Sequence, residues 1–286
     1  MPARLIINAD DFGLTVGINR SIEELHRAGA LSSATLMANG PTFADAVAVA
    51  HRNPTLGVGC HVVLVDGTPI SPPDSIPSLI GSDGQSFHTS LVGFAAAALR
   101  GHLRPQDIRT EILAQIRKLQ AAGLSVTHLD THKHAHIFPA VSRPLLDVAR
   151  QTSVHAIRNP FEQPWNLALG HGTHLRRLQI RLLTNLQRHF KANMNFSLDF
   201  ISTTDGTVGI SATGHLDAPT LSQLLQHLPP GTWELVCHPG YNDSDLDRAH
   251  TRLRVHRNIE RLALTDVIPR ALSLPGAPTL IHYGKI

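Results

Sequence analysis

Apolar runs alternate along the chain with amphipathic segments, and this alternation is the main signal of its fold. Short apolar runs bounded by turn residues are typical of buried strands, whereas apolar residues that recur every three or four positions predict helices. The pattern predicts strands at 5–8, 33–38, 56–64, 127–136, 154–157, 196–201, 233–240 and 278–282. It predicts helices at 16–28, 42–51, 108–119, 139–150, 175–190, 221–228 and 253–264.

This order of strands and helices predicts an α/β protein with a parallel sheet and helices outside it. The simplest arrangement is a closed (β/α) barrel, with a distorted or seven-stranded barrel as variants. A chain of 286 residues fits one such barrel, so we expect a single domain over residues 1–286. In barrels of this kind the carboxyl ends of the strands carry the chemistry.

Composition excludes several classes of protein. A hydrophobic share of 42% and a mean hydropathy of -0.03 are ordinary for a globular chain. The formal net charge is only +3 and its basic residues are scattered, which argues against a nucleic-acid partner. The start of the chain leads directly into an apolar strand, so we expect no signal peptide, no membrane span and a cytoplasmic location.

The chain has two cysteines, which exclude a disulfide-rich scaffold. Cys60 directly precedes His61, and Cys237 directly precedes His238. Because neighbours on a strand point to opposite faces, we expect the cysteines to pack against helices while the histidines face elsewhere.

One segment concentrates four histidines and an aspartate on alternate positions: His128, Asp130, His132, His134 and His136. In an extended chain these side chains would line one face. A helix is the alternative, because His132 and His136 are also one helical turn apart. Either geometry gathers imidazoles, which bind transition metals well. His128 precedes the expected strand end and fits a hydrogen-bonded interior residue.

Polar residues also follow the predicted ends of separate strands, and they form a candidate metal site. A catalytic divalent metal needs about three protein ligands and an open position for water. Asp11, His61 and His132 supply such ligands from three strands, and the neighbouring Asp10 would accept a proton from metal-bound water. The alternative for the two acids is a helix-capping turn. Beside the histidine segment, the metal site is the better interpretation.

Four further residues have less specific signals. His134 and His136 fit either partners of the ligands or substrate contacts. His238 is a candidate general acid for a leaving amine, or a structural residue at a strand end. Arg158 either orients Asp10 or the substrate, or forms an ordinary ion pair.

Three other regions bear on the site. Gly57 and Gly59 share the face of His61 and leave room in front of it, as a crowded interior or a bound ligand requires. The segment 66–88 predicts a long loop, either a binding segment or lid or a mobile insertion without function. The helix expected at 175–190 carries four arginines, for which a solvated face is the preferred interpretation.

Four separated motifs resemble those of the YdjC-like deacetylases, at residues 8–14, 57–61, 127–136 and 237–241. The resemblance covers nearly the whole chain in the same order. It implies a (β/α) barrel related to the NodB-type polysaccharide deacetylases, a divalent metal, and hydrolysis of an acetamide on an amino sugar.

The resemblance also implies roles for individual residues. Asp11, His61 and His132 match the family's metal ligands, Asp10 matches its catalytic base, and His238 takes the place of the acid. It further implies Mg²⁺ as the metal and a homodimer as the assembly. Histidine ligands equally suit Zn²⁺.

The branch of the family stays open. Lys133 stands where the carbohydrate-acting members more often have histidine, and the run 61–67 is similar to the hopanoid-associated branch. The run 237–241 instead resembles the chitooligosaccharide branch. The expected substrate is therefore a chitooligosaccharide or an N-acetylglucosaminyl glycolipid such as a hopanoid.

We therefore expect a metal-dependent hydrolase that removes the N-acetyl group from an acetylated amino sugar and releases acetate. A metal-dependent phosphoesterase on a similar barrel is one alternative. A carbohydrate-binding or metal-storing protein without catalysis is another, although storage would not need the spare carboxylate of Asp10.

Overall fold

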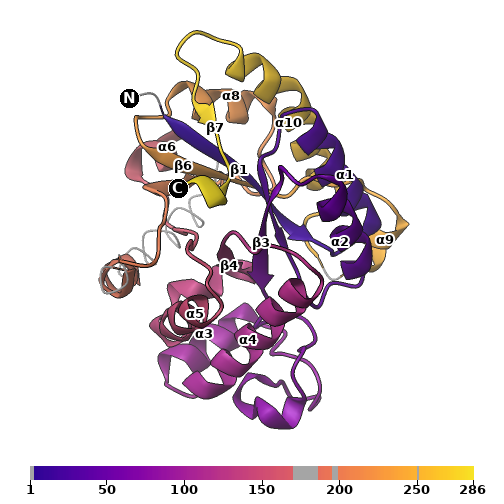
Figure 1. Ribbon diagram of the computed structural model, residues 1–286, viewed down its shortest axis with the longest axis vertical. Helices are drawn as coiled ribbons and strands as arrows, with labels where there is room; N and C mark the ends of the chain where they lie inside the picture. Colours follow the sequence, from indigo (N-terminus) through magenta and orange to yellow (C-terminus); the bar gives the residue numbers. More distant parts are fainter. Residues whose placement is uncertain (1–2, 170–185, 195–198, 250) are drawn as a thin grey trace.

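The computed structural model describes residues 3–169, 186–194, 199–249 and 251–286, and a parallel sheet forms its centre (Figure 1). The strands are β1 (Arg4–Phe12), β2 (Ser33–Leu36), β3 (Gly57–Val62), β4 (Leu129–Thr131), β5 (Gly206–Val208), β6 (Thr232–Cys237) and β7 (Thr279–Leu280). Their order is β4-β3-β2-β1-β6-β5, and β7 pairs with the start of β1. Parallel pairing brings the carboxyl ends of these strands to one side of the sheet.

Helices follow the strands along the chain and cover the outside of the sheet (Figure 1). They are α1 (Val16–Arg27), α2 (Phe43–Arg52), α3 (Leu91–Leu99), α4 (Pro105–Ala121), α5 (Pro139–Gln151), α6 (Pro164–Leu169), α8 (Ala218–Gln226), α9 (Ser244–Arg248) and α10 (Val255–Leu272). Short 3-10 helices occur at Pro73–Ser75, Pro77–Leu79, His132–Ile137 and Tyr283–Lys285. No helix within the described ranges is both long enough and apolar enough to cross a membrane.

The outer strands β4 and β5 are linked through the chain segment between them. Leu129 of β4 forms an isolated parallel bridge with Ile157, and Glu162 forms one with Thr207 of β5. The strand predicted at 154–157 is thus reduced to single bridges in an irregular segment. The α/β class and the (β/α) barrel are confirmed, with the barrel distorted at this place.

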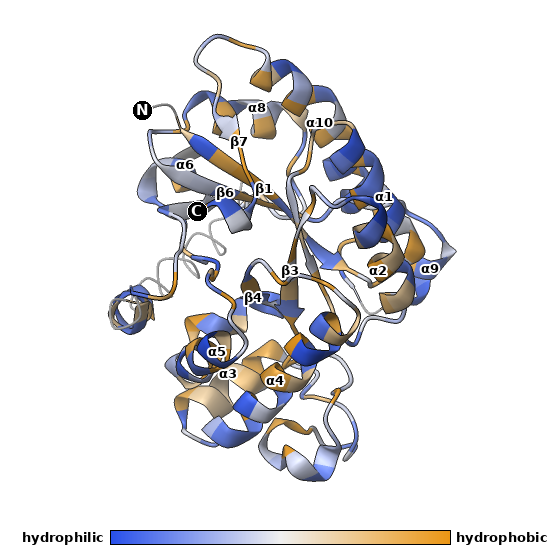
Figure 2. Ribbon diagram, in the orientation of Figure 1, coloured by the Kyte–Doolittle hydropathy of each residue, from blue (hydrophilic) through white to orange (hydrophobic). Residues whose placement is uncertain are grey.

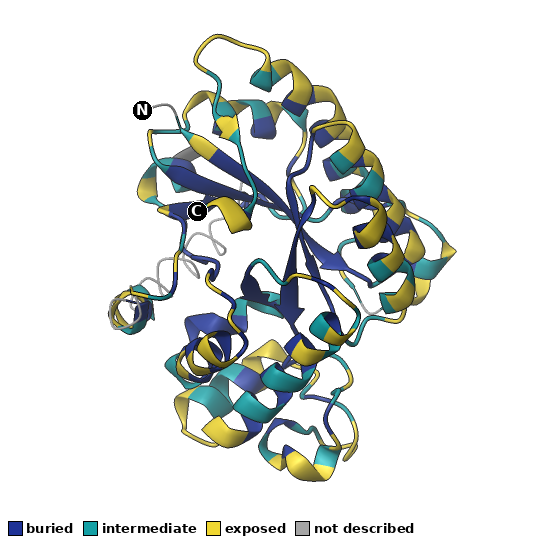
Figure 3. Ribbon diagram, viewed as in Figure 1, coloured by how far each residue is buried: buried dark blue, intermediate teal, exposed yellow. Residues whose placement is uncertain are grey.

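The central strands are buried on both faces (Figure 3). In β1, the side chains of Leu5, Ile7 and Ala9 belong to the large apolar core, with the inward faces of the helices (Figure 2). The alternate residues Asn8 and Asp10 instead make polar contacts, with Thr35 of β2 and with His128 and Arg158. The interior of the barrel is therefore polar toward the carboxyl ends of the strands, whereas Ile6 packs in a small apolar cluster nearer their amino ends.

Local capping explains where the first helix begins. Thr15 precedes α1, and its side chain accepts a hydrogen bond from the backbone N–H of Ile18. The helix buries one apolar face, and Gly29 follows it with a φ of 70°, as the pattern predicts. Because Thr15 caps this helix, the alternative of Asp10 and Asp11 as its capping turn is wrong.

Several elements differ from the expectation. The strand predicted through residue 136 is wrong beyond Thr131, where the chain turns. Helices α3, α6 and α9 and strand β5 lack a counterpart among the predicted elements. Most of the predicted helix 175–190 and part of the predicted strand 196–201 lie outside the described residues. Both cysteines are free and lie in the apolar core, as expected.

Candidate metal centre and active site

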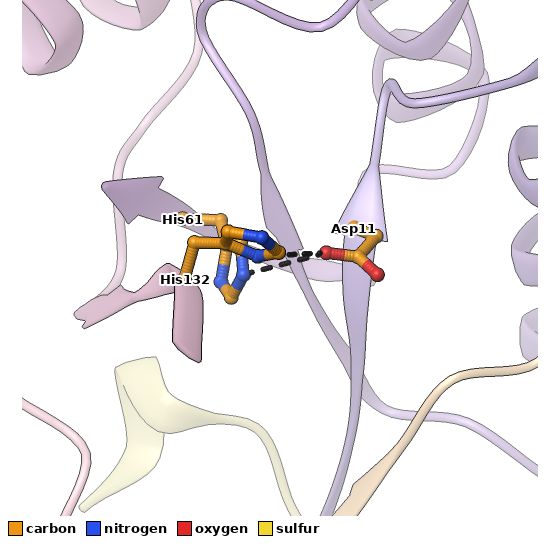
Figure 4. A group of neighbouring side chains, drawn as sticks. All are labelled: Asp11, His61 and His132. Atoms are coloured by element: carbon orange, nitrogen blue, oxygen red, sulfur yellow. Dashed lines mark ion pairs between the residues drawn. The ribbon is translucent and has the colours of Figure 1, made fainter. Parts of the chain in front are cut away.

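Three side chains from separate strands converge at the carboxyl ends of β1, β3 and β4 (Figure 4). Asp11 belongs to β1 and His61 to β3, while His132 directly follows β4. The Oδ1 atom of Asp11 lies 3.5 Å from Nε2 of His61 and 3.4 Å from Nδ1 of His132. One ligand atom from each residue lies within 4.8 Å of the other two. The structure therefore brings together the three residues predicted as ligands.

An irregularity in β1 lets two consecutive acids reach the same site. Strand periodicity would point Asp10 and Asp11 to opposite faces. However, the register with β2 shifts between Ala9 and Phe12, and Asp11 has a φ of 63°. Such irregularities re-aim side chains. Asp10 consequently faces the barrel interior, and Asp11 reaches the histidines from the strand end.

The histidine segment keeps its alternation only as far as His132. Thr131 is extended, but Lys133 and His134 have φ angles of 55° and 54°. This left-handed conformation is unfavourable for residues with a Cβ atom. It reverses the chain immediately after His132, so that side chain lies at the end of β4 and the next histidines point elsewhere.

Hydrogen bonding determines which nitrogen of His61 faces Asp11. Nδ1 of His61 lies 2.8 Å from Oδ1 of Asp130, a carboxylate acceptor, so Nδ1 carries the proton of this bond. Nε2 is the atom that faces Asp11. Burial alone would lower the pKa of His61, but Asp130 raises it to about 9. A proton or a cation at Nε2 is thus strongly favoured by the surrounding carboxylates.

Arg158 lies fully buried among three carboxylates. Its guanidinium contacts the two oxygens of Asp10 at 2.6 and 2.8 Å, Asp130 at 2.7 Å and Glu234 at 2.7 Å. The contact with Asp10 fits both an ordinary ion pair and the predicted role of orienting Asp10. The bidentate geometry fixes the plane of the Asp10 carboxylate.

The three carboxylates around Arg158 differ in pKa, because burial and the guanidinium act on each of them in opposite directions. Burial opposes ionisation of Asp10 and Asp130, but Arg158 lowers the pKa of both below the ordinary value. Burial raises the pKa of Glu234 to about 7, against the opposing effect of Arg158. Asp10 is therefore a carboxylate at neutral pH, and Glu234 takes up a proton near neutrality.

The second oxygen of Asp11 is held by an arginine from the far end of the chain. Nη2 of Arg257, in α10, lies 2.5 Å from Oδ2 of Asp11. Both side chains are buried, and Arg257 lowers the pKa of Asp11 well below its usual range although burial opposes this. The arginine leaves Oδ1 of Asp11 directed at the two histidines.

His238 follows β6 and lies between two carboxylates. Its Nε2 is 3.8 Å from Oδ2 of Asp10, and its Nδ1 is 3.9 Å from Oε2 of Glu260. The backbone N–H of His238 donates to the same oxygen of Glu260. The side chain is 13% exposed, so a substrate group can approach it from the solvent side.

The remaining histidines of the segment are neutral, and His128 and His136 are buried while His134 is half-buried. Burial lowers the pKa of His128 and His134 to about 3 and that of His136 to about 4. His128 stacks on Tyr283, with ring centres 3.9 Å apart, and lies 3.2 Å from Asn8. His128 is thus the hydrogen-bonded interior residue that the sequence predicts.

His136 and His134 differ in their hydrogen bonds. His136 bonds Thr131 through Nδ1 and the carbonyl oxygen of Arg158 through Nε2. It therefore supports the backbone that carries the buried arginine. Nδ1 of His134 is buried and has no hydrogen-bond partner among the described residues.

The two glycines of β3 make room for histidines other than His61. A Cβ atom on Gly59 would lie 2.4 Å from Cε1 of His128, and one on Gly57 would lie 2.6 Å from Cβ of His282. The glycines are thus needed by the crowded barrel interior, which was one of the two explanations considered.

The segment 66–88 is tied to the body of the protein by buried acids of α4. Glu111 is fully buried, and its two oxygens accept hydrogen bonds from the backbone N–H groups of Ile70 and Ser71 at 2.9 Å. Asp107 accepts one from Ser78 in the same way. These bonds hold the segment against α4 and argue against a mobile insertion.

Backbone strain gathers around this site. Four of the five described non-glycine residues with positive φ are Asp11, Asp66, Lys133 and His134. Asp66 and Lys133 form an ion pair of 2.5 Å that joins the loop after β3 to the turn after β4. Strained residues of this kind persist where the surroundings over-determine them, and they cluster at functional sites.

Charge and donor chemistry both fit a divalent metal. Two buried guanidinium groups face five buried carboxylates: Asp10, Asp11, Asp130, Glu234 and Glu260. The carboxylates outnumber the guanidinium groups, and they raise the pKa of His61 to about 9, so a cation beside this imidazole is favoured. The predicted ligands offer one oxygen and two nitrogen atoms, a donor set that catalytic divalent metals use.

Comparison with known proteins agrees with this arrangement. The model of the YdjC-like protein family matches residues 4–272. The chain belongs to the YdjC-like family. A carbohydrate deacetylase of Brevibacillus brevis is 39% identical over 189 residues, which cover 65% of this chain and 69% of that relative. A carbohydrate deacetylase of Thermoanaerobacter pseudethanolicus is 29% identical over 265 residues, or 92% and 90% of the two chains.

A solved structure shares the fold of this YdjC-like chain. A protein of Enterococcus faecalis V583, described as a cellobiose-phosphate cleavage protein, matches with a TM-score of 0.79. The match covers 100% of this chain and 99% of that one at 24% identity. The predicted family and the barrel fold are both confirmed.

Some residues of the site had no predicted role. Asp130 was recognised as part of the alternating segment, but its contact with His61 depends on strand register. The sequence does distinguish Glu234, because it is a charged residue inside the apolar run of β6. Arg257 and Glu260 lie in α10 among other polar residues, and nothing local distinguishes them.

Proposed function

We propose that this YdjC-like protein is a metal-dependent hydrolase that removes the N-acetyl group from an acetylated amino sugar and releases acetate. The observation that carries the proposal is the convergence of Asp11, His61 and His132 beside the ionised carboxylate of Asp10. The relatives named carbohydrate deacetylases support the choice of an acetylated sugar.

Asp11, His61 and His132 would hold the metal ion. The family resemblance favours Mg²⁺, and the two imidazole donors also suit Zn²⁺. When bound, the ion would polarise the acetyl carbonyl group and lower the pKa of water.

The side chains around this position would divide the proton transfers. Asp10, fixed by Arg158, would accept a proton from the attacking water as the new C–O bond forms. His238 would donate a proton to the amine nitrogen as the C–N bond breaks. The products would be acetate and a free amino group on the sugar.

Arg158 also weighs against the phosphoesterase alternative. Such enzymes often use two metal ions about 4 Å apart. A second group of potential ligands does exist at Asp10, His61 and Asp130. However, the guanidinium of Arg158 already contacts both of these carboxylates. A fixed cation in that place favours one metal ion per chain, and hence the deacetylase.

The proposal is tested by acetate release from a panel of N-acetylated oligosaccharides and glycolipids, with and without chelator. We expect Asp11→Ala and His132→Ala to abolish release while circular dichroism shows an intact fold. Asp147→Ala, in an exposed ion pair of α5, is the control and should keep full activity. Unchanged release from either ligand variant would refute the proposal. So would a wild-type protein that releases phosphate from a matched panel of sugar phosphates but no acetate from the acetylated panel.

A further inference from the structure

Asp130 lies where the proposed ligands meet the proposed base. Its side chain is fully buried. Oδ1 accepts the hydrogen bond of Nδ1 of His61 at 2.8 Å, and Oδ2 lies 2.7 Å from Nη1 of Arg158. The register of β3 and β4 places His61 directly opposite Asp130. The carboxylate of Asp130 thus contacts the proposed metal-binding residue His61 through one oxygen and Arg158, which holds Asp10, through the other.

We propose that Asp130 is a positioning residue that orients two parts of the site at once. It keeps the His61 ring with Nδ1–H toward itself, so that the lone pair of Nε2 faces Asp11. It also keeps Arg158 in the plane in which both oxygens of Asp10 are bound. This inference rests on the proposed function and adds the residue that couples the ligand geometry to the base.

The donors on both sides explain why a carboxylate is needed. His61 and Arg158 both present N–H groups to Asp130, and Thr35 adds an O–H at 3.1 Å. A carboxylate accepts from all of them, whereas an asparagine amide has one accepting oxygen and one donating nitrogen. In either orientation, the N–H group of the amide would face an N–H group of His61 or of Arg158.

Each orientation of such an amide has a definite consequence. If its nitrogen faces His61, the ring must accept at Nδ1 and carry its proton on Nε2, which removes the lone pair that a metal needs. If its nitrogen faces Arg158, the guanidinium is pushed away, and the bidentate contact with Asp10 is distorted.

Asp130→Asn is therefore the variant of choice. It has the same size as the wild-type side chain and leaves Arg158 paired with Asp10 and Glu234, so no buried charge loses every partner. Asp107→Asn is the matched control, because Asp107 is also a buried aspartate that accepts a hydrogen bond, but it lies in α4 outside the site.

Two measurements separate positioning from general stability. The affinity for Zn²⁺ is measured against a competing chromophoric chelator. The Nδ1–H resonance of His61, assigned with His61→Gln, is followed by ¹H–¹⁵N NMR with and without the metal. We expect Asp130→Asn to bind Zn²⁺ about 10- to 100-fold more weakly. In Asp130→Asn the Nδ1–H resonance of His61 should move upfield or be lost through rapid exchange with water. Asp107→Asn should retain the wild-type Zn²⁺ affinity and the wild-type resonance.

The outcomes are distinct. Wild-type Zn²⁺ affinity and an unchanged resonance in Asp130→Asn would overturn the inference, and so would equal losses in the control. If the wild type binds Zn²⁺ and shows the expected differences from Asp130→Asn, yet releases no acetate from any acetylated sugar, the proposed function fails and the positioning role of Asp130 stands.

Discussion

Replacing Arg158 by methionine would remove the guanidinium that compensates three buried carboxylates, namely Asp10, Asp130 and Glu234. Removing one partner of a buried ion pair costs about 3–5 kcal/mol, because the remaining charge is left uncompensated in the interior. Folded domains are stable by only about 5–15 kcal/mol in total. We therefore expect Arg158→Met to lose a large share of the free energy of unfolding at pH 8.

The loss should depend on pH in a definite direction. Arg158 now lowers the pKa of Asp10 and Asp130 although burial opposes this. Without the guanidinium, burial dominates and raises both folded-state values above those of the unfolded chain. Groups with a raised folded pKa stabilise at low pH and lose that contribution as pH rises through the folded pKa. The variant should therefore be closer to the wild type at pH 5 than at pH 8.

Urea unfolding followed by circular dichroism at both pH values measures this difference. Arg109→Met is the control, since its ion pair with Asp147 is 40% and 51% exposed and should contribute at most about 1 kcal/mol. If Arg158→Met proves too unstable to purify, Arg158→Lys keeps the charge and should give an intermediate loss. A deficit below about 1 kcal/mol at pH 8, or a larger deficit at pH 5, would refute the reasoning.

Two further predictions concern stability. Gly59→Ala should lower the free energy of unfolding by about 1–3 kcal/mol, because its Cβ atom would lie 2.4 Å from His128. Gly93→Ala is the control: the nearest neighbour of its Cβ atom would be 3.7 Å away, so it should be neutral or stabilising by up to about 1 kcal/mol. Equal midpoints of Gly59→Ala and wild type would contradict this. Glu234 has a pKa of about 7 against an ordinary 4.5, so its contribution is present below pH 4.5 and is lost as pH rises through 7. The wild type should therefore lose on the order of 3 kcal/mol relative to Glu234→Gln over this interval; a constant difference between the two unfolding curves would speak against the shift.

The sequence by itself determined the order of strands and helices and the positions of the reactive groups on them. Alternating apolar runs and helical periodicity are local properties, because they depend on neighbours two to four positions away. The same local alternation predicted that Asp130 and His132 share one face of an extended chain, and the strand-end position of Asp11 and His61 followed from the fold class. These residues could be identified without knowing what they touch.

Only the tertiary structure decided which of these groups meet and in which state of charge. His61 and Asp130 are 69 positions apart, Arg158 and Asp10 are 148 apart, and Arg257 and Asp11 are 246 apart. Their contacts depend on strand register and on how the irregular segment 154–162 links β4 to β5. The left-handed turn after Thr131 likewise overrides the local strand pattern, since surrounding contacts can hold a backbone conformation that the residues themselves disfavour. Burial and shared partners then set the pKa values, and neither is written in any local stretch of the chain.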